Sequence, residues 1–549
     1  MAARAIPARP WVPATEFTRP LLPGRSWFIA ALAAAAAFGI TFAITASAGH
    51  GFATINEGLA VRTVAAMVPA AAAALAAYAV LKPWPAYPIA LLLTPFWNAA
   101  GISLQIGPLQ IILQTVFILA LATGCLIQAR VGPGSMRRSP ARVRPAELTR
   151  RRFRDLSAYR FAEVGALMLM VLGLLSTLVS LDLITSASVL LHGIVEPVAM
   201  GAILVWMRPS RRNLVFVCIS LGVAAGLGSV LNVLQALPQT TSLAGLQAHR
   251  LFFALVSFYN VGLFGTVLAM VIPLLFGVLF ARRAVNMPKW LTALVAAMLA
   301  ACLVGLFLSF SKSADLAVAA GTILLLVLLV KSWRRRAAIV LAAGMASTLL
   351  VPWPALVLQV APSLDNAYRT AMVSLIGEAR FDSWNPATAA GHGSIAERFY
   401  AIEGAVTMAE SHPLLGIGLD EFRHYYVTLG YRPSEARARP DHAHSLFPEV
   451  AAELGWPAMV MVMAIFGSAL WAMWRVYRAP PDELARALAA VLIASLVAWL
   501  IAATAFGCDI YRPVRDMSSD VVTAAVIVAA AIALARSTHE SGPSRRIAG

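Results

Sequence analysis

The chain has 549 residues, of which 60% are hydrophobic and 13% are charged, and its mean hydropathy is +0.77. Too few polar residues remain to cover a soluble globule, and the apolar stretches repeatedly reach membrane-spanning length. The formal charge of +17 would suit a nucleic acid partner, but the Lys and Arg residues gather between apolar stretches, on one predicted side. The sequence therefore predicts an all-α, polytopic membrane protein without a nucleic acid partner.

About fourteen stretches are apolar and long enough to cross a lipid bilayer as helices. Their predicted bounds are 26–48, 59–81, 86–103, 108–127, 162–181, 188–207, 214–236, 254–280, 290–310, 314–330, 337–358, 456–474, 487–507 and 519–535. An even number of spans returns both termini to one side of the membrane. The first span ends near small residues, Ala46 and Ala48, but exceeds the apolar run of a cleaved signal peptide, so we expect a retained anchor.

The positive-inside rule orients these spans with both termini in the cytoplasm of a bacterial inner membrane. Every even-numbered connection is basic, and the residues concerned are Lys82, ten arginines from Arg130 to Arg160, Arg208, Arg211, Arg212, Arg282, Arg283, Lys289, Lys331, Arg334, Arg335, Arg336, Arg475, Arg478 and Arg486. The longest connection, about 359–455, falls on the periplasmic side and holds seven arginines against twelve acidic residues. We expect the chemistry of the protein there.

These assignments divide the chain into seven segments. They are a cytoplasmic N-terminus (1–25), N-terminal spans (26–127), a basic cytoplasmic linker (128–161), central spans (162–358), the periplasmic loop (359–455), C-terminal spans (456–535) and a cytoplasmic tail (536–549). The linker is rich in Pro, Arg and Ser, which is typical of a solvated segment that can contact anionic lipid headgroups. Four cysteines, Cys125, Cys218, Cys302 and Cys508, share no disulfide or zinc spacing.

Three short helices are predicted within the periplasmic loop. The first, AERFYAIEGAVTMAES, has one apolar face and stops at His412-Pro413. That face comprises Phe399, Ile402, Val406 and Ala409. The second is DEFRHYYVTLG, and the third, SLFPEVAAELG, has Ser445 as its N-cap and Pro448 in its first turn.

Five of the nine histidines lie in this loop, which indicates a site, and the densest cluster is Asp441-His442-Ala443-His444. Three interpretations are open: a metal-binding pair, a general base, and ordinary loop polarity. His-x-His with one Asp lacks the further ligands of a metal site. The helix that follows favours a neutral imidazole at His444, because the positive end of its dipole opposes imidazolium, and this suits a base.

The sequence HAHSLFPEVAAELG resembles the His-x-His-Asn-x-x-Leu-x-x-x-x-Glu-x-Gly signature of the O-antigen ligase and O-antigen polymerase superfamily. ERFYAIEGAVTMAESHPLLGIGLDEF is similar to the Arg-containing helix and Pro-Leu-Leu-Gly-x-Gly of that family, and two upstream segments, HRLFFALVSFYNVGLFGTVLAMVIPLLFG and LFLSFSKSADLAVAAG, also match. The resemblance covers about 245–475. Ser445 replaces the usual Asn, Pro448 the usual Leu and Lys312 the usual Arg.

The resemblance implies a GT-C-like, inverting, metal-independent glycosyltransferase without a cofactor. It would transfer a glycan from undecaprenyl diphosphate to an acceptor hydroxyl, with His444 as base. Arg250, Arg398 and Lys312 would bind the diphosphate, because Arg and Lys neutralise its growing charge. His442 and Ser445 would support His444. Without the resemblance, Arg250 reads as an interface anchor and Arg398 as a partner of a neighbouring Glu.

Several functions remain open. The acceptor could be lipid A-core, a growing polysaccharide or a protein hydroxyl, which correspond to a ligase, a repeat-unit polymerase and a protein O-oligosaccharyltransferase. A non-enzymatic exporter of lipid-linked glycans would place charges along the spans, and a scaffold for envelope proteins would need no catalytic histidine. Three ionisable residues, Arg62, Asp182 and Glu196, lie in or near spans, and Glu196 in mid-span has no evident explanation.

Overall fold

The structure is a computed structural model of the whole chain. It describes residues 73–92 except 75, 103–106, 109–131, 145–236, 261–309, 311–330, 394–432, 442–505 and 519–540, together with isolated positions between 332 and 370 and at 440. The predicted spans at 26–48 and most of those at 59–81 and 337–358 lie outside these residues, as does Arg62.

Eight helical segments are long and apolar enough to cross a membrane within the described part of the chain. They lie in α5 (Pro145–Val179), the continuous α6 (Leu183–Val189), η3 (Leu190–Val195) and α7 (Glu196–Trp206), α8 (Arg211–Ala236), α10 (Val261–Ala281), α11 (Lys289–Ser309), α21 (Trp456–Arg478), α22 (Glu483–Ala505) and α23 (Ser519–Glu540). Each corresponds to a predicted span, so the polytopic helical class is confirmed.

Other predicted spans differ from the structure in length or type. The apolar helices at Thr115–Ile127, within α4 (Leu113–Val131), and at Ser313–Leu329, within α12 (Lys312–Leu329), are shorter than a full span, and α3 (Pro83–Leu92) has ten residues. Besides its helices, the described part of the chain has one short hairpin, in which β1 (Ser103–Ile106) pairs antiparallel with β2 (Leu109–Ile112).

The helical core is built around α10, which packs against α8, α11, α12 and α22. Consecutive residues from Leu268 to Ile272 are fully buried, so α10 is covered on all sides, as its uniformly apolar sequence requires. Small residues bring the helices close: a Cβ added at Gly277 would lie 2.0 Å from Cγ2 of Val491 on α22. The centre of the molecule is therefore an α10–α22 contact without space for a larger side chain.

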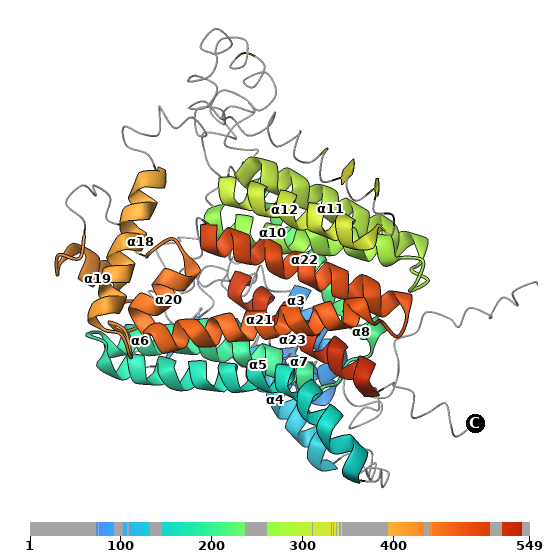
Figure 1. Ribbon diagram of the computed structural model, residues 1–549, viewed down its shortest axis with the longest axis horizontal. Coiled ribbons are helices and arrows are strands. Elements are labelled where there is room, and N and C mark those ends of the chain that lie inside the picture. The colour runs from blue at the N-terminus through green and yellow to red at the C-terminus, as the bar shows by residue number, and fades with distance from the viewer. Residues whose placement is uncertain are drawn as a thin grey trace, which may run out of the picture.

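A second layer pairs α5 with α21 and α7 with α23 (Figure 1). Helix α5 begins at Pro145, so helical structure extends into the segment interpreted as a linker. Along its apolar part, large side chains such as Leu167, Leu174 and Leu178 are more than half exposed. Such a surface would be unfavourable in water but suits contact with lipid tails.

The predicted loop contains α18 (Ser394–Ser411), α19 (Phe422–Val427) and α20 (Leu446–Leu454), which we call the loop unit. It lies at one end of the long helices (Figure 1), where α20 packs against α18, α21 and α5. All three predicted helices are confirmed. The predicted apolar face of α18 is right at Ala409, which is buried, and wrong at Phe399, which is exposed. The buried face also includes Ala401, Ala405 and Met408.

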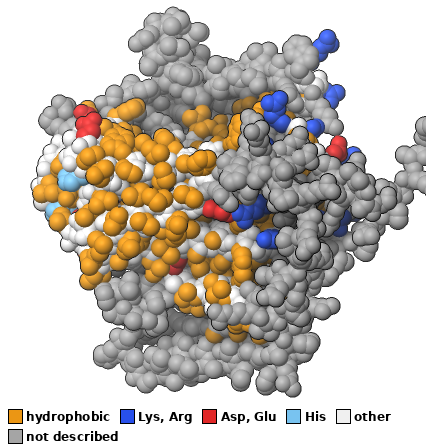
Figure 2. Space-filling view, turned by 60° about the horizontal axis from the view of Figure 1, so that its bottom comes forward, with side chains coloured by type: hydrophobic (Ala, Val, Ile, Leu, Met, Phe, Trp, Pro, Cys, Tyr) orange, Lys and Arg blue, Asp and Glu red, His pale blue; other side chains and the backbone are white. Residues whose placement is uncertain are grey.

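Figure 2 shows hydrophobic side chains over much of one face, with Lys and Arg toward one end and histidines at the opposite end. The histidine end is the end of the loop unit in Figure 1. Basic residues at one end of a bundle and apolar side chains around its middle form the pattern of a positive-inside membrane protein.

Candidate functional site

The candidate site begins at the turn that leads into α20. His444 has a left-handed backbone conformation with φ of +55°, which is uncommon for a residue other than Gly. This turn brings the ring of His444 to 4.0 Å from the ring of His442, centroid to centroid, at an interplanar angle of 69°. His442 is buried and His444 is half-buried. The two histidines therefore form one unit, with His444 the more accessible.

Ser445 occupies the N-cap position of α20, as predicted, but its hydroxyl does not cap the helix. Instead, Ser445 Oγ donates a 2.9 Å hydrogen bond to the carbonyl oxygen of Thr504 near the end of α22. The bond ties the start of α20 to a membrane helix about sixty residues later in the chain. It fixes the position of His444 relative to the helical core.

An apolar cavity of about 600 Å³ extends from α20 into the helical layer. At the loop unit it is lined by Leu446 and Val450, and near its far end Glu163 and Arg536 form an ion pair between α5 and α23. Ser176 on α5 contacts the loop unit, and Glu163 lies thirteen residues earlier, about 20 Å along the helix. The cavity is therefore elongated along the helices and begins two residues after His444.

The Pro-Leu-Leu-Gly-x-Gly turn and the Glu-x-Gly end of α20 are packed directly on each other. The backbone N–H groups of Ile417 and Gly418 donate to the carbonyls of Ala452 and Glu453, at 2.9 and 3.2 Å. Gly416 has φ of +68°, and a Cβ there would lie 2.2 Å from the Glu453 carbonyl carbon. Only glycine fits at such a position, which explains why two distant parts of the sequence carry glycines together.

The carboxyl group of Glu453 is buried beside two other acidic residues. Its side chain is 2% exposed, and Oε1 accepts a long 3.4 Å hydrogen bond from the backbone N–H of Phe422. Burial, and then the charges of Asp420 and Glu421, raise the pKa of Glu453 well above its ordinary value. Glu453, the glutamate of the Glu-x-Gly motif, therefore favours the neutral form. Its carboxyl group contacts other residues of the loop unit.

The structure describes two of the three residues that were predicted to bind the diphosphate. Arg398 is half-buried on α18, and Ala401, one turn later, shares a buried cluster with Ala443 beside His444. Lys312 is the first residue of α12. Arg250 lies outside the described residues.

A hydrogen-bonded connection between the α5–α6 turn and the loop unit was not predicted from the sequence. Ser176 Oγ donates to the Glu453 carbonyl at 2.6 Å, Ser180 Oγ donates to Glu421 Oε1 at 2.6 Å, and Ser186 Oγ donates to the Leu419 carbonyl at 2.6 Å. In the sequence, the short polar connection at 180–182 indicates a turn between two helices. It does not indicate that this turn bonds to Glu421, about 240 residues later.

Glu196, the unexplained mid-span residue, is buried with a histidine on the same helix. His192 Nδ1 lies 3.0 Å from Glu196 Oε1, and the hydroxyl of Thr115 donates a hydrogen bond to this oxygen. His192 lies in the π-helical turn η3, and such turns place side chains differently from an α-helix. Glu196 thus belongs to a buried polar cluster that connects α4 with the η3–α7 span.

Among the described residues, no group of three or more His, Cys, Asp or Glu side chains could hold a metal ion. The rings of His442 and His444 lie in contact with each other, and Arg398 lies on α18, which packs against α20.

The fold and this arrangement define a polytopic helical membrane protein with a histidine-bearing helical unit at one end of its spans. Residues 297–463 match the family model described as O-antigen ligase, so this stretch of the chain is similar to that family. The match runs from α11 through the loop unit into α21, within the region of the predicted resemblance, which is confirmed. No curated protein matches the chain.

Proposed function

We propose that the protein is a membrane glycosyltransferase that transfers a glycan from undecaprenyl diphosphate to an acceptor hydroxyl at the periplasmic face. The observation that carries this proposal is that α20, the helix that follows His444, lines an elongated apolar cavity with Leu446 and Val450. The cavity would accommodate part of a lipid chain, while the polar head of the same molecule would lie beside the histidine turn. The O-antigen ligase match supports glycosyl transfer of the ligase or polymerase type.

In the proposed reaction, His444 accepts the proton of the acceptor hydroxyl as its oxygen attacks the anomeric carbon. The bond from that carbon to the diphosphate oxygen breaks, and the diphosphate leaves with the bonding electrons. Attack opposite the leaving group inverts the anomeric centre. Arg398, Lys312 and Arg250 would stabilise the charge that develops on the diphosphate, since guanidinium and ammonium groups bind phosphate oxygens strongly.

His442 and Ser445 would position the base. The ring of His442 contacts that of His444, and Ser445 anchors the turn to α22 through the Thr504 carbonyl. A base must lie within hydrogen-bonding distance of the proton that it removes, so small shifts of this turn would lower the rate.

The test is glycan transfer from extracted lipid-linked donor by membranes that contain wild type or His444→Ala at equal abundance. We expect His444→Ala to lower the rate roughly 10²- to 10⁴-fold, the contribution typical of a general base. His412→Ala is the matched control: His412 also belongs to the loop unit, where Nδ1 pairs with Ser411 Oγ, but lies at the end of α18. It should transfer glycan like wild type.

Full transfer by His444→Ala would refute the mechanism and favour an exporter or scaffold. When transfer occurs, the product identifies the reaction. Modified lipid A-core indicates a ligase, a longer polysaccharide indicates a polymerase, and a glycosylated protein indicates an O-oligosaccharyltransferase.

A further inference from the structure

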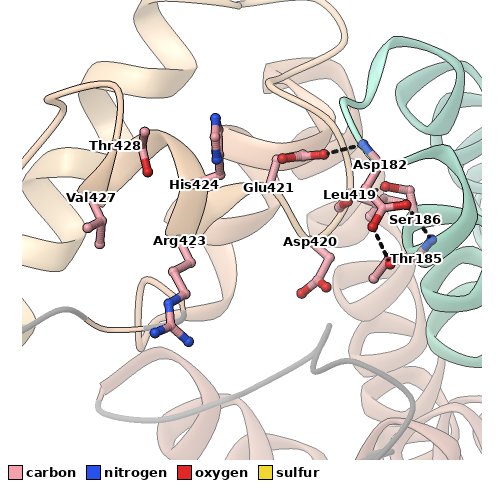
Figure 3. A pocket seen from close by; sticks show the side chains of 10 residues that line it. All are labelled: Asp182, Thr185, Ser186, Leu419, Asp420, Glu421, Arg423, His424, Val427 and Thr428. Atoms are coloured by element: carbon pink, nitrogen blue, oxygen red, sulfur yellow. Dashed lines mark hydrogen bonds between the residues drawn. The ribbon is translucent and has the colours of Figure 1, made fainter.

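A second cavity, of about 330 Å³, lies between the α5–α6 turn and the segment formed by α19 and the residues just before it (Figure 3). Its polar walls include Asp182, Thr185, Asp420, Arg423, His424 and Thr428. The two walls come from parts of the sequence about 240 residues apart, and Asp182 and Thr185 lie outside the stretch that matches the O-antigen ligase model. The cavity is therefore distinct from the histidine turn.

Hydrogen bonds hold the two walls in place without any ligand. Glu421 is 5% exposed, and its Oε1 accepts from Ser180 Oγ at 2.6 Å and from the backbone N–H of Asp182 at 2.8 Å. Ser186 Oγ donates to the carbonyl of Leu419 at 2.6 Å. Because these bonds are buried or half-buried, the cavity is a formed part of the fold, as most small-ligand sites are.

The chemistry of the cavity fits a neutral, hydroxyl-rich ligand. Asp420 supplies carboxylate acceptors, Arg423 and His424 supply donors, and Thr428 supplies a hydroxyl that can do both. Leu419 and Val427 add apolar wall. In Figure 3 the side chains of Asp420 and Arg423 extend to the same side of their turn, so both could contact one ligand.

Other ligand classes fit less well. Three carboxylates against one guanidinium disfavour a phosphate or another anion, and the polar walls disfavour a lipid chain. No group of metal-ligating side chains was found among the described residues. A sugar ring, with several hydroxyls and an apolar face, matches the mixture of acceptors, donors and aliphatic side chains.

The cavity and the histidine turn lie at opposite ends of α20. The nine residues of this helix span about 13 Å. His444 precedes its first residue, whereas Glu453 near its end accepts the N–H of Phe422, next to Glu421 in the cavity wall. A glycan whose reacting end lies at His444 would therefore reach the cavity with a sugar remote from the reacting bond.

We infer that this cavity is a carbohydrate subsite that holds such a remote sugar residue and contributes to glycan selection. The inference rests on the proposed function. A contact that stabilises substrate and transition state equally affects KM and leaves kcat unchanged, and we expect this of a contact far from the reacting bond. The glycan could belong to the donor or to the acceptor.

The test uses full-length Asp420→Asn and Arg423→Gln in membranes. Asn accepts the left-handed backbone of Asp420, where φ is +62°, so the first variant changes charge and keeps the turn. We expect KM for one substrate to rise roughly 10-fold in each variant, as for loss of a charged hydrogen bond, with kcat unchanged. Titrating each substrate in turn shows whether the donor or the acceptor glycan occupies the cavity. Glu410→Gln, an exposed change on α18, is the control.

A binding measurement separates this inference from the proposed function. The probe is the oligosaccharide released by mild acid from the lipid-linked pool of the native strain, or the delipidated acceptor glycan, titrated against His444→Ala. Weaker binding after adding Asp420→Asn supports the subsite even if transfer is absent. Unchanged KM for both substrates together with unchanged probe binding overturns the subsite, and the proposed function then still depends on the His444→Ala assay.

Discussion

At the scale of single residues, the two ends of α20 place ionisable side chains in different environments. His444 precedes the helix and is half-buried in a strained turn, whereas Glu453 near its end is 2% exposed. Burial and the nearby Asp420 and Glu421 raise the pKa of Glu453, so the folded protein retains a proton that the unfolded chain releases. The contribution of this proton to stability is complete below the ordinary pKa of 4.5 and is lost as the pH rises through the raised folded value.

We predict that Glu453→Gln makes the loop unit less sensitive to alkaline pH. Glutamine keeps an oxygen for the Phe422 N–H and removes the cost of a buried carboxylate beside two acidic residues. The unfolding temperature of the purified protein, measured between about pH 5 and pH 8, should fall less steeply with pH for the variant than for wild type. At the upper end of this range, the unfolding temperature of the variant should equal or exceed that of wild type. Parallel curves for the two proteins would contradict this assignment.

At the scale of elements, close helix contacts depend on individual glycines. Gly277 of α10 faces Val491 of α22, and an added Cβ would lie 2.0 Å from one Val491 methyl carbon. Both residues belong to helices that are largely buried, and Val491 is buried itself, so solvent does not relieve overpacking there.

Gly277→Ala should therefore destabilise the protein by about 1–3 kcal/mol, the usual cost of an overpacked core. Val491→Ala removes the clashing methyl groups, and the double variant should recover much of the loss. Both effects are measured by heating each purified variant in mild detergent. The readout is the fraction of protein that remains in the monodisperse peak on size-exclusion chromatography. If the two changes are simply additive, the α10–α22 contact is not the cause.

At the scale of the whole molecule, the loop unit is fastened to the N-terminal half by hydrogen bonds to the α5–α6 turn. Ser186 Oγ donates to the Leu419 carbonyl at 2.6 Å, and the same oxygen lies 2.6 Å from Ser180 Oγ. This connection crosses from a part of the chain outside the O-antigen ligase match to a part inside it. The loop unit is thus positioned by helices that the family motif does not include.

Ser186→Ala should loosen this connection, because a buried carbonyl that loses its donor costs about 1–3 kcal/mol. Limited proteolysis of membranes should cleave the loop unit several-fold faster than in wild type. Ser468→Ala is the matched control, since Ser468 Oγ bonds the Ile465 carbonyl within α21. Equal cleavage rates for Ser186→Ala and wild type would show that these bonds do not hold the unit.

The sequence by itself determined the membrane class, most spans within the described residues, the three helices of the loop unit and the His442–His444 turn. These features depend on local apolar length, helix-stop residues and charge distribution, which are properties of neighbouring residues. Tertiary structure decided which face of α18 is buried, that Ser445 bonds Thr504, and that Glu196 pairs with His192 and Thr115. It also decided the two cavities and the fastening of α5–α6 to the loop unit. Each depends on contacts between residues distant in the chain, and no local pattern specifies which helices meet.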